Sequence, residues 1–199
     1  MCKIICVTNR HICNNDYINQ INKIASSDID SVILREKDMN DEEYRNICIK
    51  LNKICAKNGK ELIINSNVRV ANECRISKVH LPMHILRTLG HDERKNFTTL
   101  GASCHSVEEA VEAEKSGCTY IVAGHIFATD CKRDLKPRGI EFLKSVCQSV
   151  TVPVYAIGGI SRENIKSVMN AGASGVCIMS GLMMCDNPKE FIEQLKEGL

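Results

Sequence analysis

Eight short apolar runs recur along this chain, and they constrain its fold more than any other feature. In 199 residues they leave about 25 residues per run, which is the length of a compact strand–helix unit. The runs are Ile4–Val7, Val32–Leu34, Leu62–Ile64, Val79–Leu81, Leu100–Ala102, Tyr120–Ala123, Val154–Ile157 and Val176–Met179. Their apolarity is continuous rather than alternating, which is typical of parallel strands covered on both faces.

Helical patterns lie between most of these runs. Segment 40–57 has apolar side chains at helical spacing. At two places in the chain, an Asn or Ser stands three positions before a Glu, as in the capping box at the start of a helix. The two predicted boxes are Asn40 with Glu43 and Ser106 with Glu109. Asn187 and Pro188 are placed as the N-cap and first residue of a final helix. The third and fourth helices must be short, because little chain separates the strands on either side of them.

A weak internal repeat favours a closed sheet. Segments Ser106–Gly117 and Ser161–Gly172 each run from a predicted Ser N-cap to a helix-ending Gly. Their starts lie 55 residues apart, which is two strand–helix units. We therefore expect an α/β fold with a closed eight-stranded barrel and a single domain over residues 1–199. An open doubly wound sheet alternates strands and helices in the same way and is the alternative.

Composition argues against several classes of partner. The chain has 26 basic and 24 acidic residues, for a net charge of +2, so nothing general points to nucleic acid or an anionic membrane. Trp is absent and aromatic residues make up 4%, which argues against base stacking. With no apolar leader and no membrane-spanning run, we expect a cytoplasmic protein with a small-molecule ligand. Sequence leaves homo-oligomerisation open.

The 12 cysteines are expected to be mostly reduced thiols in the core. No CxxC pair is present, whereas zinc sites usually contain such close ligand pairs. Disulfides are rare in the cytosol, and a free Cys behaves as a small hydrophobic residue. We therefore expect no resident metal.

Function in such a barrel is expected where the strands end at their carboxyl termini. After the seventh and eighth strands come Gly158 and Gly159, then Ser180 and Gly181. Small residues there let backbone N–H groups approach a phosphate, and a following helix N-terminus adds positive potential. The alternative is that these glycines only form tight turns.

Two cations follow the second strand. Arg35 and Lys37 alternate along the chain and are predicted to point to one side, with Glu36 on the other. This arrangement suits a second anionic group of the ligand. Ion pairs with Glu36 and Asp38 are the alternative.

His125 is the best candidate for proton transfer. It follows the sixth strand and a glycine, and histidine exchanges protons near neutral pH. A purely structural role is the alternative. His80 and His84 have HxxxH spacing, but no Glu stands beside His80 as in a metalloprotease helix. Other residues expected at the same rim are Asn65, Ser103, Thr129, Lys132 and Met179.

Several of these segments together resemble the thiamin phosphate synthase superfamily. They are Leu34–Asp38, Leu62–Asn65, Val79–Leu81, Gly101–His105, Ile157–Ile160 and Val176–Gly181. The resemblance spans nearly the whole chain in the right order. It implies a TIM (β/α)8 barrel that acts in thiamin biosynthesis on a thiazole phosphate.

Two departures favour one branch of that superfamily. The synthases hold Mg²⁺ with an Asp where this chain has Ser66, and with an acid after the fourth strand, where no carboxylate precedes Asp92. The stretch from Gly124 to Lys132, with His125 in place of the usual Pro, resembles the TenI-type thiazole tautomerases. The resemblance implies a metal-independent isomerase that aromatises a thiazole carboxylate phosphate, with His125 as acid and base. The alternatives are a divergent Mg²⁺-dependent thiamin phosphate synthase and a non-catalytic regulator.

Overall fold

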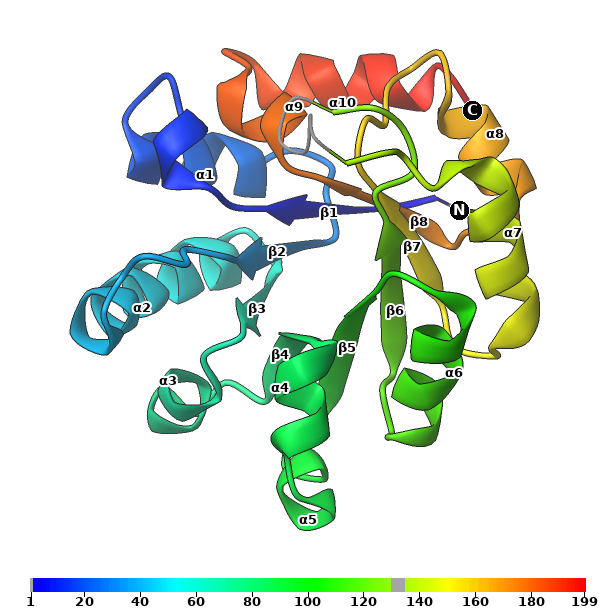
Figure 1. Cartoon of the computed structure of the whole chain (residues 1–199). Coiled ribbons are helices and arrows are strands. Elements are labelled where there is room, and N and C mark those ends of the chain that lie inside the picture. Colours follow the sequence, from blue (N-terminus) through cyan, green and yellow to red (C-terminus); the bar gives the residue numbers. More distant parts are fainter. Residues whose placement is uncertain (1, 130–134) are drawn as a thin grey trace.

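The chain closes into a barrel of eight parallel strands in sequential order, with β8 pairing with β1 (Figure 1). The structure is a computed structural model that describes residues 2–129 and 135–199. The strands are β1 (Lys3–Val7), β2 (Ser31–Leu34), β3 (Glu61–Asn65), β4 (Lys78–Pro82), β5 (Thr99–Cys104), β6 (Tyr120–Gly124), β7 (Val154–Ile157) and β8 (Gly175–Ile178). The predicted single-domain α/β barrel is confirmed.

Helices cover the outside of this barrel (Figure 1). They are η1 (Arg10–Ile12), α1 (Tyr17–Ala25), α2 (Asp41–Lys57), α3 (Val68–Glu73), α4 (Met83–Thr88), α5 (His91–Arg94), α6 (Val107–Lys115), α7 (Gly139–Ser149), α8 (Ile165–Asn170), α9 (Ser180–Met184) and α10 (Pro188–Lys196). The helices after β3 and β4 have six residues each, as the short spacing between strands predicts.

Strand side chains alternate between two apolar layers. On β1, Ile4 and Cys6 pack against the helices, whereas Ile5 and Val7 point into the barrel. Both layers are buried, which explains why the strands are apolar at consecutive positions. The inner layer is small and includes Tyr120 and Tyr155 among aliphatic residues and Cys177.

Helix capping follows the sequence signals in part. Asn40 and Glu43 form the predicted capping box at the start of α2. Ser106 caps α6 by accepting from the Glu109 N–H. The Glu109 carboxylate, however, accepts from the N–H of His105 at 2.6 Å, one residue before the cap. The second predicted box is therefore only half correct.

The predicted N-cap at Ser161 is wrong, because α8 begins later. Its N-cap is Asn164, and the Asn164 carboxamide accepts from the Ser161 N–H at 2.9 Å. The amide thus holds a turn that precedes the helix. The predicted helix-ending glycines are correct, since Gly117 and Gly172 adopt φ of 89° and 100°, a region that glycine enters without steric cost.

Every cysteine that the structure describes is a free thiol, and most are buried. Burial raises the pKa of Cys55 and of Cys118 to about 12, so these thiols stay protonated and serve as core packing. Cys131 lies outside the described residues. Within residues 2–129 and 135–199, no helix has the length and apolarity needed to cross a bilayer.

Candidate active site

A cavity of about 940 Å³ opens at the carboxyl ends of the strands. The predicted site residues that line it are Arg35, Lys37, Asn65, Ser103, His125, Thr129, Gly158, Gly159, Met179, Ser180 and Gly181. Lys132 lies outside the described residues. The structure therefore brings together every predicted site residue that it describes.

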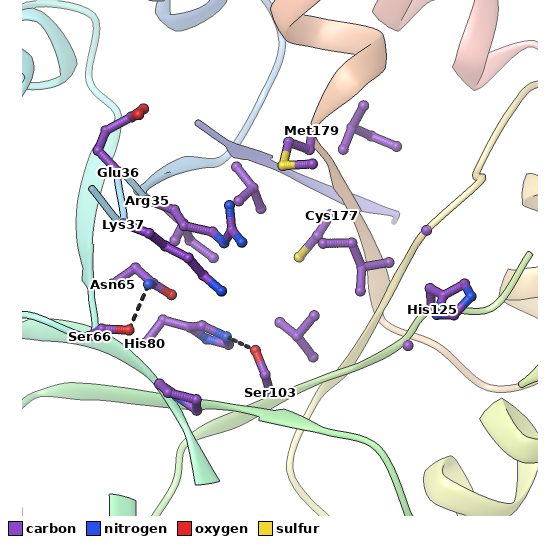
Figure 2. Close-up of a pocket in the computed structure, with 18 of the residues that line it drawn as sticks. Arg35, Glu36, Lys37, Asn65, Ser66, His80, Ser103, His125, Cys177 and Met179 are labelled. Atoms are coloured by element: carbon purple, nitrogen blue, oxygen red, sulfur yellow. Dashed lines mark hydrogen bonds between the residues drawn. The ribbon is translucent and has the colours of Figure 1, made fainter. Parts of the chain in front are cut away.

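Arg35 and Lys37 form what we call the cationic edge of the cavity. Figure 2 shows both side chains pointing into the cavity while the Glu36 side chain points away. The two residues follow β2 directly, and the Arg35 N–H donates to the Thr8 hydroxyl at 2.9 Å. The predicted alternation of side chains is present.

The carboxylate of Glu36 anchors this edge from behind. It is buried and accepts from the Thr8 hydroxyl at 2.8 Å, the Tyr17 hydroxyl at 3.0 Å and the Arg10 N–H at 3.1 Å. Every donor comes from the segment after β1, so the carboxylate ties that segment to the end of β2. A buried carboxylate with several donors is stable where an unpaired one is not.

Arg10 is the partner of both acids near the cationic edge. Its guanidinium contacts Glu36 at 3.2 Å and Asp38 at 2.5 Å, and its hydrogen bond lowers the pKa of the Asp38 carboxyl. Within the described ranges, no ion pair involves Arg35 or Lys37. The alternative drawn from sequence, ion pairing of these cations with Glu36 and Asp38, is therefore wrong, and both cations face the cavity.

The glycine edge consists of Gly158, Gly159, Ser180 and Gly181, after β7 and β8. Gly158 and Gly159 have φ of +100° and +65°. A Cβ on Gly158 would lie 2.4 Å from the Cβ of His125, and one on Gly159 would lie 2.4 Å from the Ala128 carbonyl oxygen. Both positions require glycine, so the tight turn considered from sequence is present.

The same turn leaves backbone donors at the cavity. Among described residues, the N–H groups of the glycine edge have no protein acceptor. Helix α9 after β8 has only five residues, so its macrodipole is small, contrary to the expected contribution of a helix N-terminus. The individual N–H groups are what this edge offers an anion.

His80 lies at the floor of the cavity and was missed as a site residue. Its Nε2 is 2.7 Å from the Ser103 hydroxyl and its Nδ1 is 3.0 Å from the Tyr120 hydroxyl. Burial lowers the pKa of His80 to about 3, so the ring is neutral at pH 7. The available signal was a polar residue in β4 between Val79 and Leu81, which face the helices.

His125 lines the cavity but lies apart from this cluster. Figure 2 shows its ring away from Lys37, His80 and Ser103. The side chain is buried, and its Nε2 is 3.2 Å from the carbonyl oxygen of Leu135. Since a carbonyl only accepts, this nitrogen carries the proton.

The described residues do not fit a protein-held Mg²⁺. Only Glu36 and Asp41 supply carboxylates to the described lining. The first is occupied as above, and Asp41 pairs with Arg69 and accepts from Asn67. The Ser66 hydroxyl accepts from the Asn65 amide at 2.8 Å. In residues 2–129 and 135–199 no three His, Cys, Asp or Glu side chains are grouped to bind a metal, whereas Mg²⁺ prefers carboxylate oxygens.

Comparison with known proteins decides the family. Residues 4–182 match the model of the family described as thiamine monophosphate synthase. The chain belongs to this family. The resemblance seen in the sequence motifs is thereby confirmed at the level of the superfamily.

Relatives and solved structures agree over nearly the full length. The thiamine-phosphate synthase of Clostridium acetobutylicum is 33% identical over 195 residues, covering 94% of this chain and 90% of the relative. That of Fusobacterium nucleatum is 32% identical, covering 98% and 95%. The thiamine phosphate pyrophosphorylase of Pyrococcus furiosus superposes with a TM-score of 0.84 at 26% identity, covering 98% and 94%.

The tautomerase expectation is wrong as the main function. These family members are named synthases, and similarity over the whole chain outweighs the short stretch around His125 that suggested an isomerase. The relatives favour the transferase alternative, in thiamine biosynthesis. The expectation drawn from Ser66 bears on the metal and not on the family.

Proposed function

We propose that this chain is a transferase that joins a pyrimidine diphosphate to a thiazole phosphate to make thiamin phosphate. The bond that forms links the pyrimidine methylene carbon to the thiazole nitrogen. The bond that breaks is the one from that carbon to the diphosphate, which leaves as inorganic pyrophosphate with the electron pair. The thiazole nitrogen carries no proton, so the bond-forming step needs no general base.

The proposal rests on two edges of one cavity that each present groups suited to an anion. Arg35 and Lys37 suit a diphosphate, because both are cations without an ion pair in the described part of the chain. The N–H groups of the glycine edge suit the phosphate of the second substrate. In the barrel order only β1 separates the two flanking strands β2 and β8. Two phosphorylated substrates can therefore bind side by side.

Stabilisation of the leaving pyrophosphate is the main contribution that these residues make. Charge grows on the diphosphate oxygens as the bond breaks, and cations fixed beside it lower the barrier. Because the carboxylates of the site are occupied, no step in this proposal passes through a metal held by the protein. The ligands are small molecules, and the free thiols support a reducing compartment such as the cytoplasm.

Product formation tests the proposal directly. Purified protein is incubated with the pyrimidine diphosphate and thiazole phosphate in buffer containing Mg²⁺, and thiamin phosphate is measured as fluorescent thiochrome. We expect thiamin phosphate and pyrophosphate in equal amounts, with much slower formation by the Arg35→Ala/Lys37→Ala variant. Folded wild-type protein that forms no product above the uncatalysed rate would overturn the proposal. Turnover would also exclude a purely regulatory role.

A further inference from the structure

We propose that Tyr120, His80 and Ser103 form a hydrogen-bonded chain of fixed direction that turns the Ser103 hydroxyl into a donor toward an anion in the cavity. His80 and Tyr120 are then positioning residues, and Ser103 makes the contact. The identity of the anion, a diphosphate or pyrophosphate oxygen, rests on the proposed function. The direction of the hydrogen bonds from Tyr120 through His80 to Ser103 does not depend on that function.

The barrel register places the three residues together. His80 on β4 is opposite Gly101 on β5, and Gly101 is opposite Tyr120 on β6. A Cβ on Gly101 would lie 2.1 Å from the Tyr120 ring. Glycine on the middle strand therefore lets the tyrosine reach across it and stack on the histidine, with ring centroids 5.5 Å apart and planes at 27°.

Hydrogen-bond accounting sets the direction of the chain. A tyrosine hydroxyl has one proton to donate, and in the described part of the protein His80 Nδ1 is its only hydrogen-bond partner. A neutral imidazole accepts at one nitrogen and donates at the other. If Tyr120 donates to Nδ1, then Nε2–H donates to the Ser103 oxygen at 2.7 Å. The opposite tautomer would leave the buried tyrosine proton without an acceptor, which is unfavourable.

The hydroxyl proton of Ser103 is consequently left for the cavity. Ser103 is half-buried and lines the cavity, and His80 is its only recorded partner among the described residues. Donors linked in series polarise one another, so the terminal hydroxyl is a stronger donor than an isolated serine. Figure 2 shows Lys37 reaching toward the same part of the cavity. A negatively charged oxygen would be held there by both groups.

The tautomer of His80 is measurable in the intact protein without any ligand. In ¹⁵N NMR spectra of histidine-labelled protein at pH 7, we expect His80 to be neutral with its proton on Nε2. Its signals are assigned by their loss in His80→Gln. In Tyr120→Phe we expect the preference for the Nε2–H tautomer to weaken. Tyr155→Phe is the matched control, because Tyr155 also lies inside the barrel against Tyr120 but makes no recorded hydrogen bond to His80. An Nδ1–H tautomer or an imidazolium in wild-type protein would overturn the proposal.

Binding of inorganic pyrophosphate tests the action through Ser103. We expect Tyr120→Phe and Ser103→Ala each to weaken binding roughly three- to tenfold, as for loss of one hydrogen bond. The double variant should bind no more weakly than Ser103→Ala, and Tyr155→Phe should bind as the wild type. Additive losses in the double variant would overturn the proposal. Wild-type protein with the expected tautomer but no pyrophosphate binding would instead overturn the choice of anion and the proposed function with it.

Discussion

The two edges of the cavity offer an anion different kinds of contact. The cationic edge consists of two long side chains, Arg35 and Lys37, on a segment that the buried Glu36 carboxylate ties down from behind. The glycine edge offers mainly backbone N–H groups, and an added Cβ at Gly158 or Gly159 would collide with the loop that follows β6. Charge at the first edge can be removed without disturbing packing. At the second edge, the backbone conformation that requires glycine is also what presents the N–H groups to an anion.

This difference separates affinity from stability. A substitution on the cationic edge should change ligand binding and leave the free energy of unfolding nearly unchanged. A substitution on the glycine edge should change both together.

Gly158→Ala should have the largest effect. The added Cβ would lie 2.4 Å from the His125 Cβ, at a φ of +100°. Steric overlap and left-handed strain together should lower the free energy of unfolding by about 3 kcal/mol or more, and the affinity for the thiazole phosphate should fall with it. Urea unfolding measures the first quantity and calorimetric titration the second.

Gly117→Ala is the matched control, because Gly117 has φ of +89° but nothing within 4 Å of an added Cβ. It should lose only about 1 kcal/mol, from strain alone. Equal losses in the two variants would mean that the approach of the His125 loop is not what requires glycine at position 158.

Arg35→Ala and Lys37→Ala should come next, with a loss of affinity alone. Each removes one charged hydrogen-bond donor, so each should weaken pyrophosphate binding roughly tenfold, and the double variant roughly 100-fold. The free energy of unfolding should change by less than about 0.5 kcal/mol. Lys50→Ala, at an exposed position on α2, should leave both quantities unchanged. A large loss of stability in the double variant would contradict the contrast between the edges.

Acidification should destabilise the floor between the edges. Burial lowers the pKa of His80 from 6.5 to about 3, so between these values the unfolded chain binds a proton that the folded chain does not. The free energy of unfolding is therefore not reduced by His80 above pH 6.5, and it falls as the pH drops toward 3. From pH 7 to 5, wild type should lose about 2 kcal/mol more than His80→Gln. Parallel pH dependence of urea unfolding in the two proteins would show that His80 is not held neutral.

Ser66→Asp should have the smallest effect of these substitutions, and it should add a carboxylate ligand for a divalent cation to the site. Ser66 has φ of 64°, a conformation that Asp tolerates better than most residues. The new carboxylate should strengthen Mn²⁺ binding in the presence of pyrophosphate roughly tenfold, measured by electron paramagnetic resonance. Ser66→Asn is the neutral control and should bind Mn²⁺ as the wild type does. Equally tight Mn²⁺ binding by wild type would contradict the misfit described for this site.

Much of the site was predictable because it follows directly from strand order. Gly158 and Ser180 could be placed at one rim as soon as the apolar runs were read as barrel strands, since parallel strands all end at the same side. The pairing of Arg10 with Glu36 and Asp38 could not be predicted. The partners are 26 and 28 residues apart in sequence and meet only after β1 and β2 pair. The local spacing of residues therefore does not indicate these ion pairs.

The residues around His125 do not indicate the reaction, for a related reason. His125 and its neighbours form a short distinctive stretch, and a local motif says little about which neighbours a ring will meet. In the folded chain the His125 ring contacts the Leu135 carbonyl, whereas His80, dismissed with His84 as a metal motif, is linked to Ser103 and Tyr120. The strand register brings these three residues together, because Gly101 on the middle strand leaves room for the Tyr120 ring.

By itself the amino-acid sequence determined the barrel, the order of its strands, the ends of several helices and the rim that carries the cavity. These depend on apolar periodicity, capping residues and glycines, which act over a few residues. Only the tertiary structure decided which cations are left unpaired, which carboxylates are occupied and how the protons of the floor are oriented. Those properties depend on contacts between strands that lie far apart in the chain, and on burial, which no single segment possesses before the barrel closes.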